Sequence, residues 1–329
     1  MPQTNVKHWR RLDNAAKLFP AASSKRDTRV FRFYCELKED IQQEILQKAV
    51  DRTLEKYPIF LSVLRKGLFW HYLEQSNKRP VVREEYKEPC SSLYIRDKRD
   101  LLFEVTYYKK RINFEVFHVL TDGMGGINFL RELTYQYLRL AHKDLQEKLG
   151  DSLSVDTSLN REDSFLKNYK KSSAKGYQTK KAYLIRGEKL RPGEFGVMHG
   201  YMKIPELKRV CHAMGISINE YLVSVYIWSV YTECLHGMPS KCPIRVAVPV
   251  NLRPYFNSIT TKNFFVMVSA EFHPTKETYT FAEVAAIVKE SLRSQINKEH
   301  LEEIFSYNVS NQKNILLRSV PIFIKAIAM

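Results

Sequence analysis

The sequence lacks the motifs that mark several common classes of enzyme. It contains no P-loop, no G-x-G-x-x-G segment and no G-x-S-x-G segment, so it carries no signature of a P-loop NTPase, a Rossmann domain or an α/β-hydrolase. It contains no internal repeat and no cluster of side chains with metal-ligand spacing, so we expect no metal site. The sequence therefore gives no sign of the commonest enzyme classes that hydrolyse nucleotides, transfer hydride or hydrolyse esters.

Cysteines and long apolar runs are also scarce. The 329-residue chain has five scattered cysteines, an odd number that suggests neither a zinc site nor a disulfide framework. The N-terminus has no apolar segment of the signal-peptide type, and the most apolar run, Tyr221 to Val230, is too short to span a bilayer. We therefore expect a cytoplasmic protein without a transmembrane segment.

Acidic residues are fewer than basic ones, with 36 Asp and Glu against 52 Lys and Arg and a formal net charge of +16. This balance favours a polyanionic partner: nucleic acid, an anionic membrane, a phosphate-bearing cosubstrate or an acidic carrier protein. A lysine-rich segment around Tyr169 and Tyr177 has the composition of a single-stranded nucleic-acid site, but it is also typical of a solvated linker. Because no nucleic-acid reader motif accompanies it, we expect no nucleic-acid partner.

The most informative part of the sequence is the segment 112–140. Ile112, Phe114 and Val116 alternate with other residues at the period of a strand, which places His118 on the same side near the strand's end. A glycine-rich turn, Thr121 to Gly126, follows. The period then becomes helical, with one apolar stripe formed by Ile127, Leu130, Leu133, Tyr137 and Ala141.

This arrangement gives a histidine a fixed direction beside a turn and a helix N-terminus. Imidazole is the usual general base near neutral pH, Asp122 can pair with an arginine and fix the turn, and Gly123 lets the backbone reverse without a side-chain clash. The competing interpretation is a buried structural histidine followed by an ordinary Asp-Gly turn.

His118 to Gly123, HVLTDG, matches the HxxxDG motif of the thioester-dependent acyltransferase superfamily, which includes chloramphenicol acetyltransferase, condensation domains of peptide synthetases, BAHD enzymes and alcohol acetyltransferases. A second segment, Val248 to Pro254 (VPVNLRP), resembles a strand of the same superfamily. The opening RRLDNAAKLFP and the later GISINEYL are similar to segments of the alcohol acetyltransferase branch, so the closest resemblance is to that branch and to condensation-like proteins.

The resemblance implies an α/β (α+β) fold of the chloramphenicol-acetyltransferase type, with two lobes of mixed sheet and flanking helices around a tunnel. We expect an N-terminal lobe over 1–150, a crossover over 151–195 and a C-terminal lobe over 196–329. The chain ends at Met329, before the further strands of the superfamily, so we expect a truncated second lobe. Two local departures are Phe117, in place of the first histidine of condensation domains, and Lys262, in place of a common glycine.

The resemblance also assigns roles to residues. His118 would be the general base, Asp122 would pair with Arg253, and Gly123 would serve the turn. Asn263 would face the tunnel and help to hold the oxyanion or the thioester. The alternatives are a surface charge for Arg253 and a polar strand edge for Asn263.

The implied function is acyl transfer from an acyl-CoA or carrier-bound thioester to an alcohol or amine, with no tightly bound cofactor. The alternative is a non-catalytic binding protein or inactive fragment of the same fold. A weaker hypothesis, from the net charge of +16, is a basic membrane-surface or nucleic-acid protein.

Periodicity also predicts the remaining elements. In the first half we expect strands over 29–37, 59–73 (two short strands), 101–108 and 112–119, all in the sheet that carries His118, and a helix over 40–56. In the second half we expect strands over 197–204, 243–249 and 263–272 and helices over 205–214, 217–235, 280–297 and 304–329. Leu207 and Val210 should point inward, and Ser217 with Glu220 should form a capping box.

Overall fold

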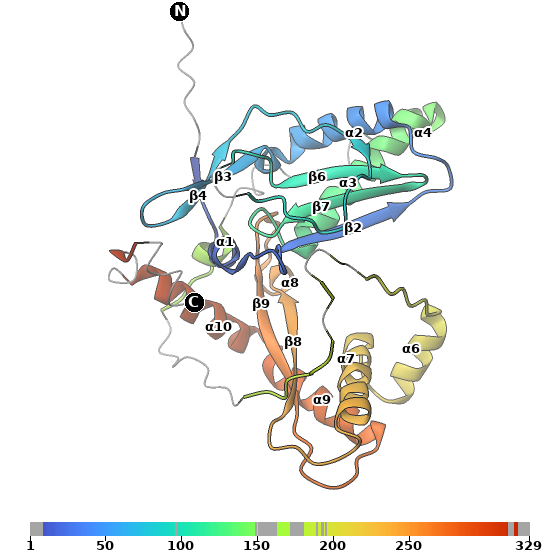
Figure 1. Cartoon of the computed structure of the whole chain (residues 1–329), viewed down its shortest axis with the longest axis vertical. Coiled ribbons are helices and arrows are strands. Elements are labelled where there is room, and N and C mark those ends of the chain that lie inside the picture. The colour runs from blue at the N-terminus through green and yellow to red at the C-terminus, as the bar shows by residue number, and fades with distance from the viewer. Residues whose placement is uncertain are drawn as a thin grey trace, which may run out of the picture.

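The structure, a computed structural model, describes residues 9–95, 98–148, 150, 163–171, 181–188, 190–191, 194, 196–314 and 319–321. It has two lobes, one above the other in Figure 1. The elements from β1 (Trp9–Arg11) to α4 (Lys143–Lys148) form the upper lobe, and those from α6 (Ile204–Ala213) to α10 (Lys298–Lys313) form the lower lobe. A short N-terminal segment with η1 (Ala15–Lys17) and α1 (Phe19–Ala22) lies at the junction between them.

The upper lobe is built on a four-stranded sheet with the order β2 (Val30–Glu36), β7 (Arg111–Phe117), β6 (Phe103–Tyr108) and β5 (Arg83–Glu84). β7 is central and pairs antiparallel with both neighbours. Two helices, α2 (Gln43–Lys56) and α3 (Gly123–Ala141), pack together, and α3 packs against β2 and β7 of this sheet (Figure 1). The predicted strands 29–37, 101–108 and 112–119 and the helix 40–56 are confirmed, because each has a regular apolar period that its neighbours bury.

The predicted membership of the sheet is partly wrong. The two short strands expected over 59–73 exist as β3 (Ser62–Lys66) and β4 (His71–Gln75), but they belong to a separate three-stranded sheet. Their third partner is β1 (Trp9–Arg11), which pairs with β4. Pairing between distant segments leaves no mark on local periodicity, so the sequence did not distinguish the two sheets.

The lower lobe rests on an antiparallel pair, β8 (Ile244–Asn251) and β9 (Phe265–Phe272). Its helices α7 (Ile218–Ser229) and α9 (Phe281–Gln295) pack on each other, and α9 packs on β9. Both helices begin with a complete capping box, Ser217 with Glu220 as predicted and also Thr280 with Glu283. The remaining helices are η2 (Pro58–Phe60), α4 (Lys143–Lys148), α5 (Ser164–Lys167), α6 (Ile204–Ala213), η4 (Val230–Cys234), α8 (Arg253–Phe256) and α10 (Lys298–Lys313).

Two predictions for the lower lobe are wrong. Residues 197–204 form no strand before α6 begins at Ile204, and Met198 and Tyr201 are 97% and 89% exposed, because no neighbouring strand pairs with this segment. On α6, Leu207 is buried as predicted, but Val210 is exposed and Cys211 is buried in its place. α10 ends at Lys313, and residues 315–318 and 322–329 of the predicted final helix lie outside the described residues.

The described part of the crossover packs against the lower lobe. Phe165 on α5 contacts Phe264 and Phe305 with ring centroids 5.0 and 6.1 Å away. Residues 172–180, which include Lys175, Tyr177 and Lys180, lie outside the described residues. In the described part of the chain, no helix has both the length and the apolar character needed to cross a membrane.

Candidate active site

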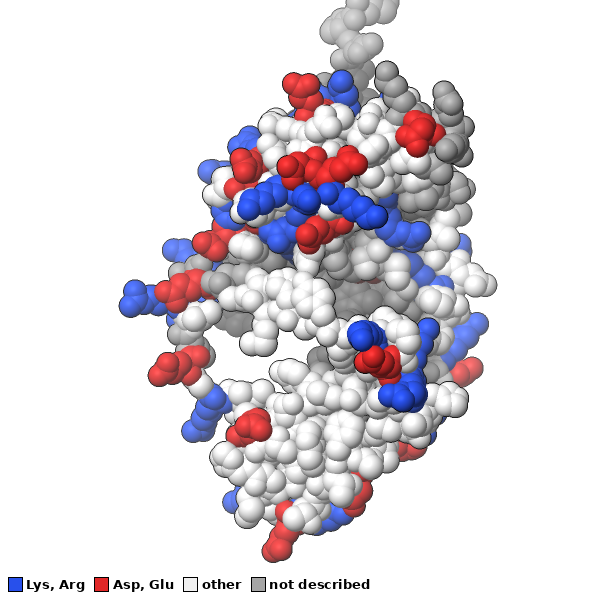
Figure 2. Space-filling model, turned by 90° about the vertical axis from the view of Figure 1, so that its right-hand side faces the viewer, with Lys and Arg blue, Asp and Glu red and all other residues white. Residues whose placement is uncertain are grey.

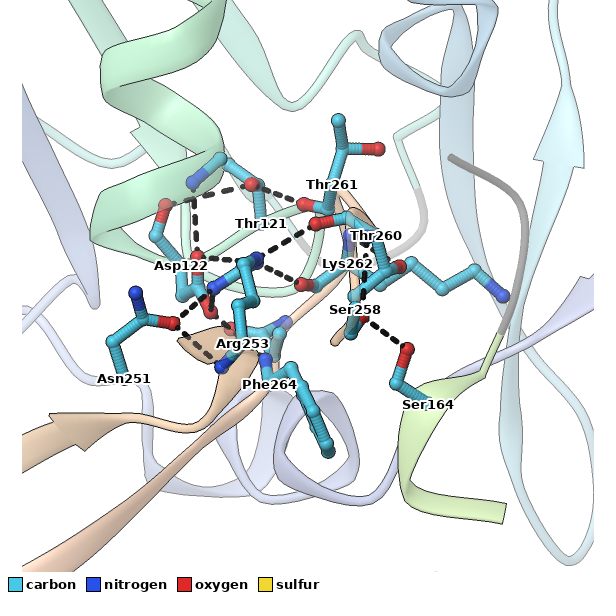
Figure 3. Close-up of polar contacts among 12 residues, drawn as sticks. Thr121, Asp122, Ser164, Asn251, Arg253, Ser258, Thr260, Thr261, Lys262 and Phe264 are labelled. Carbon is cyan, nitrogen blue, oxygen red and sulfur yellow. Dashed lines mark hydrogen bonds and ion pairs between the residues drawn. The ribbon is translucent and has the colours of Figure 1, made fainter. Parts of the chain in front are cut away.

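The two lobes are joined by a buried ion pair at the end of the HVLTDG segment. Arg253 donates from Nη1 and Nη2 to the two carboxylate oxygens of Asp122, each at 2.9 Å, and the side chains are only 8% and 5% exposed. The guanidinium also donates to the carbonyl oxygens of Thr260 and Lys262 and to Asn251 Oδ1 (Figure 3). The expected pairing of Asp122 with Arg253 is therefore present. All five N–H groups of the guanidinium have acceptors.

Asp122 makes two further contacts that fix the turn. It is the N-cap of α3, where its Oδ1 accepts from the backbone N–H of Gly125 at 3.0 Å. Its Oδ2 accepts from the backbone N–H of Phe264 at 2.8 Å (Figure 3). One carboxylate thus ties the start of α3 in the upper lobe to the segment that enters β9 in the lower lobe.

The turn needs glycine at Gly125 rather than at Gly123. A Cβ on Gly125 would lie 2.0 Å from Thr121 Oγ1 and 2.5 Å from the carbonyl oxygen of Thr261, and the Thr121 hydroxyl donates to that same carbonyl. A Cβ on Gly123 would find its nearest neighbour, a ring atom of Phe33, at an ordinary 3.9 Å. The expected clash at Gly123 is absent, and the close approach of the lower lobe makes Gly125 the constrained position.

His118 follows β7 and is held among aromatic rings. Its backbone N–H donates to the carbonyl oxygen of Arg29 at 3.0 Å, and its ring stacks on Phe19 of α1 with centroids 4.2 Å apart. Phe31 from β2 and Phe265 from β9 approach the ring at 5.0 and 5.6 Å. Segments from both lobes and from the junction therefore restrict the direction of the imidazole.

The surroundings of His118 favour its neutral form. Burial lowers the pKa of the imidazole below its ordinary value of 6.5, and the positive charge of Arg29 lowers it further. Hydrogen bonds to its own backbone and to Asn263, and the charge of Asp122, oppose this shift without cancelling it. A histidine with a lowered pKa is unprotonated at neutral pH, as a general base must be.

Asn263 contacts His118 directly. Its Oδ1 lies 3.0 Å from His118 Nδ1, and its Nδ2 donates to the carbonyl oxygen of His118 and to Asp13 Oδ2, each at 3.1 Å. The residue is only 1% exposed. Both N–H groups of the amide are thus engaged by protein acceptors, whereas the sequence had suggested a contact with the oxyanion or the thioester.

Asp13 and Phe19 are neighbours of His118 and Asn263 that the sequence did not predict. Asp13 is 3% exposed and accepts from the backbone N–H of Ala16 at 2.7 Å and from the backbone N–H of Asn263 at 3.2 Å. Burial raises the pKa of its carboxyl to about 7, although the hydrogen bonds oppose the shift. The one available signal was an aspartate placed between Leu12 and Ala16, both of which are buried.

Among the residues that the structure describes, no group of three or more His, Cys, Asp and Glu side chains is placed to hold a metal ion. The described site offers acid–base chemistry from His118, whose ring is positioned by its contacts with Asn263 and Phe19.

Figure 2 shows one outer face of the two lobes. Lysine and arginine side chains lie among acidic ones across the upper lobe, whereas the face of the lower lobe is largely uncharged. Ion pairs within the upper sheet, such as Arg111 with Glu85, also place opposite charges side by side in this lobe.

Comparison with known proteins supports the fold. No protein-family model and no curated protein sequence matches the chain. Solved structures do match in three dimensions. TRI101 of F. sporotrichioides, in complex with coenzyme A and T-2, is 11% identical, has a TM-score of 0.60 and aligns over 94% of this chain and 78% of its own.

Two further matches have the same architecture. The first condensation domain of the calcium-dependent antibiotic synthetase, in complex with a substrate analogue, is 14% identical with a TM-score of 0.58 over 90% of this chain and 76% of its own. Polyketide synthase associated protein 5 from Mycobacterium tuberculosis is 15% identical with a TM-score of 0.53 over 89% and 75%. The chain therefore has the two-lobed, chloramphenicol-acetyltransferase-like α/β fold that these proteins share.

Proposed function

We propose that this chain transfers an acyl group from an acyl-CoA or carrier-bound thioester to an alcohol or amine, with His118 as the general base. The observation that carries the proposal is the environment of His118, whose ring is held by residues of both lobes and whose pKa is lowered by burial. Its place in the HVLTDG segment, and a fold shared with a protein solved with coenzyme A and with a condensation domain, support the same chemistry.

The proposed reaction needs no covalent enzyme intermediate. His118 takes the proton from the acceptor hydroxyl or amine as that atom attacks the carbonyl carbon of the thioester. The tetrahedral intermediate then collapses, the C–S bond breaks, and the imidazolium returns its proton to the departing thiolate. The thioester is a cosubstrate, so no tightly bound cofactor takes part.

The other residues have structural roles in this proposal. Asp122 and Arg253 fix the turn after His118 and hold the lobes together, and Gly123 is the first residue of α3 within that turn. Asn263 acts on His118 itself rather than on the substrate, since both its N–H groups are engaged by Asp13 and His118. We further propose that the upper lobe, over 1–150, and the lower lobe, over 196–329, enclose the substrates, with 151–195 as the crossover.

The test is release of free thiol by the purified chain. Acetyl-CoA and longer acyl-CoAs are offered with a panel of alcohols and amines, and release is measured with and without each acceptor. We expect acceptor-dependent release from the wild-type protein and from His212→Ala, which changes an exposed histidine of α6. We expect a loss of roughly a hundredfold or more in His118→Ala.

The alternative, a non-catalytic binding protein of the same fold, predicts a different result. Coenzyme A or an acyl-CoA would bind with the same affinity to the wild-type protein and to His118→Ala, and no acceptor in the panel would stimulate thiol release. That outcome in a cooperatively folded protein would refute the transferase proposal.

A further inference from the structure

Asp13 is a buried carboxylate that the proposed reaction does not use. It lies in the junction segment between β1 and η1, and three neutral N–H groups donate to it: the backbone N–H of Ala16 to Oδ1, and the backbone N–H and side-chain Nδ2 of Asn263 to Oδ2. Burying an ionisable group is unfavourable unless it is compensated. Two of its three hydrogen bonds come from Asn263, the residue that contacts His118.

The carboxylate determines which way the amide of Asn263 points. At a pH above its raised pKa of about 7, the Asp13 carboxyl is ionised and only accepts hydrogen bonds, so the end of the amide that faces it must be its NH₂ group. The other end, Oδ1, then faces His118 Nδ1 at 3.0 Å. Because an amide oxygen only accepts, Nδ1 must carry a hydrogen for this contact to be a hydrogen bond.

The hydrogen on Nδ1 determines which ring nitrogen of His118 can accept a proton. A neutral imidazole carries one N–H, so a proton on Nδ1 leaves the lone pair on Nε2. With the amide of Asn263 reversed, its NH₂ group would face Nδ1 and would favour the tautomer with the proton on Nε2. That tautomer has no lone pair at Nε2 to accept a proton from a substrate.

We propose that Asp13 is a positioning residue that, through the amide of Asn263, holds His118 in the tautomer with the proton on Nδ1 and the lone pair on Nε2. The catalytic consequence rests on the proposed acyl transfer, whereas the tautomer itself does not. The chain of contacts joins three parts of the molecule: Asp13 from the junction segment, Asn263 from the lower lobe and His118 from the upper lobe.

The expected effect of removing Asp13 is partial. The carbonyl oxygen of His118 also accepts from Nδ2 of Asn263, at 3.1 Å, and so favours the same orientation of the amide. That bond is to a neutral acceptor, and a hydrogen bond to a charged group is the stronger of the two kinds. We therefore expect Asp13→Ala to release part of the His118 population to the other tautomer and to lower kcat about tenfold.

The test reads the tautomer directly. The full chain is labelled with ¹⁵N-histidine, and long-range ¹H–¹⁵N correlation spectra distinguish a protonated Nδ1 from a protonated Nε2 at pH 8. The His118 signals are those that disappear in His118→Gln. We expect the Nδ1–H form in the wild-type protein and in Asp100→Ala, which changes an exposed carboxylate, and a growing Nε2–H form in Asp13→Ala.

A second variant protects the test against misfolding. Asp13→Asn keeps the shape of the side chain, and its carbonyl oxygen can still accept from Asn263, so we expect it to retain more of the Nδ1–H form than Asp13→Ala does. An Nε2–H form in the wild-type protein, or an unchanged tautomer in a folded Asp13→Ala, would overturn the proposal.

Activity gives an independent outcome. In an active enzyme we expect kcat to fall in Asp13→Ala with little change in KM for the acyl-CoA. Adding Asn263→Ala to Asp13→Ala should lower kcat little further, because both residues act through one contact with His118. A fall in kcat without a change of tautomer would refute the positioning role. A change of tautomer in a chain that transfers no acyl group would support the role of Asp13 and refute the proposed function.

Discussion

The upper lobe packs two long helices on a four-stranded sheet, whereas the lower lobe packs its helices on a single pair of strands. The upper lobe supplies the histidine, and the lower lobe supplies Arg253 and Asn263, the residues that hold the turn and the ring. The difference shows that the reactive group and its restraints come from separate parts of the fold. The following variants test how far each part depends on the other.

The largest expected effect is at the ion pair between the lobes. Removing one partner of a buried pair leaves the other charge without compensation, so Asp122→Ala and Arg253→Met should each lower the free energy of unfolding by roughly 3–5 kcal/mol. Urea unfolding of the purified variants measures this loss. Arg293→Met, in a more exposed pair with Glu220 within the lower lobe, is the matched control and should cost much less. Equal losses of unfolding free energy in Arg253→Met and Arg293→Met would contradict the importance of the ion pair between Asp122 and Arg253.

The next effect is a pH dependence that originates in the junction segment. The pKa of Asp13 is raised to about 7 from an ordinary 3.8, so between these pH values the folded protein binds a proton that the unfolded chain has released. The stability contributed by this group therefore falls as pH rises through the window, by roughly 4 kcal/mol at most. The lowered pKa of His118 has the opposite effect, because its stability contribution is lost as pH falls below 6.5.

Comparing the wild-type protein with Asp13→Asn isolates the first of these effects. His118 and the charges that act on Asp13, those of Asp163 and Lys262, are present in both proteins. The stability of Asp13→Asn relative to the wild type should therefore increase between pH 5 and pH 8, as measured by urea unfolding at both pH values. A difference that stays constant with pH would show that the Asp13 carboxyl titrates normally.

A smaller effect is expected where the lower lobe approaches the turn. Gly125→Ala places a methyl group against Thr121 and the Thr261 carbonyl, and such overpacking typically costs about 1–3 kcal/mol. Gly123→Ala, two residues away, places its methyl group in ordinary contact with the ring of Phe33 and should leave the thermal midpoint unchanged or slightly raised. Equal destabilisation by both would mean that the turn itself, rather than the contact with the lower lobe, requires glycine.

The smallest effect is expected in the lower lobe, away from the ion pair between Asp122 and Arg253. Ser217→Ala removes the cap of α7, where the serine hydroxyl accepts from the backbone N–H of Glu220 at 3.2 Å. The expected loss is about 1 kcal/mol. Because this cap lies on a helix that does not touch His118, kcat for thiol release should stay at the wild-type value. A drop in kcat would show that the lower lobe acts on the site as a whole rather than through Asn263 and Arg253.

The sequence predicted the parts of the site that have a local pattern. The strand before His118 and the helix after Asp122 each have an apolar period, and both are present as β7 and α3. Even there one detail differs, since Ile127 of the predicted apolar stripe is 38% exposed. The pairing of Asp122 with Arg253 came from the resemblance to a superfamily, because no local pattern connects residues so far apart.

Other parts of the site could not be predicted because they depend on contacts between distant segments. Asp13 meets Asn263 across 250 positions of the chain, and a single aspartate near the N-terminus carries no periodicity. Which glycine of the turn is constrained depends on Thr261, which approaches from the other lobe. The predicted strand 197–204 is absent for the opposite reason: it has a suitable local pattern, but no strand among the described residues pairs with it.

The measurement that tests the central claim most directly is acceptor-dependent thiol release by wild-type protein and by His118→Ala, with acyl-CoA binding measured on the same samples. We predict that His118→Ala stays folded and still binds the thioester but transfers the acyl group at least a hundredfold more slowly. An active wild-type protein whose rate is unchanged in His118→Ala would contradict the account, because the base would then lie elsewhere.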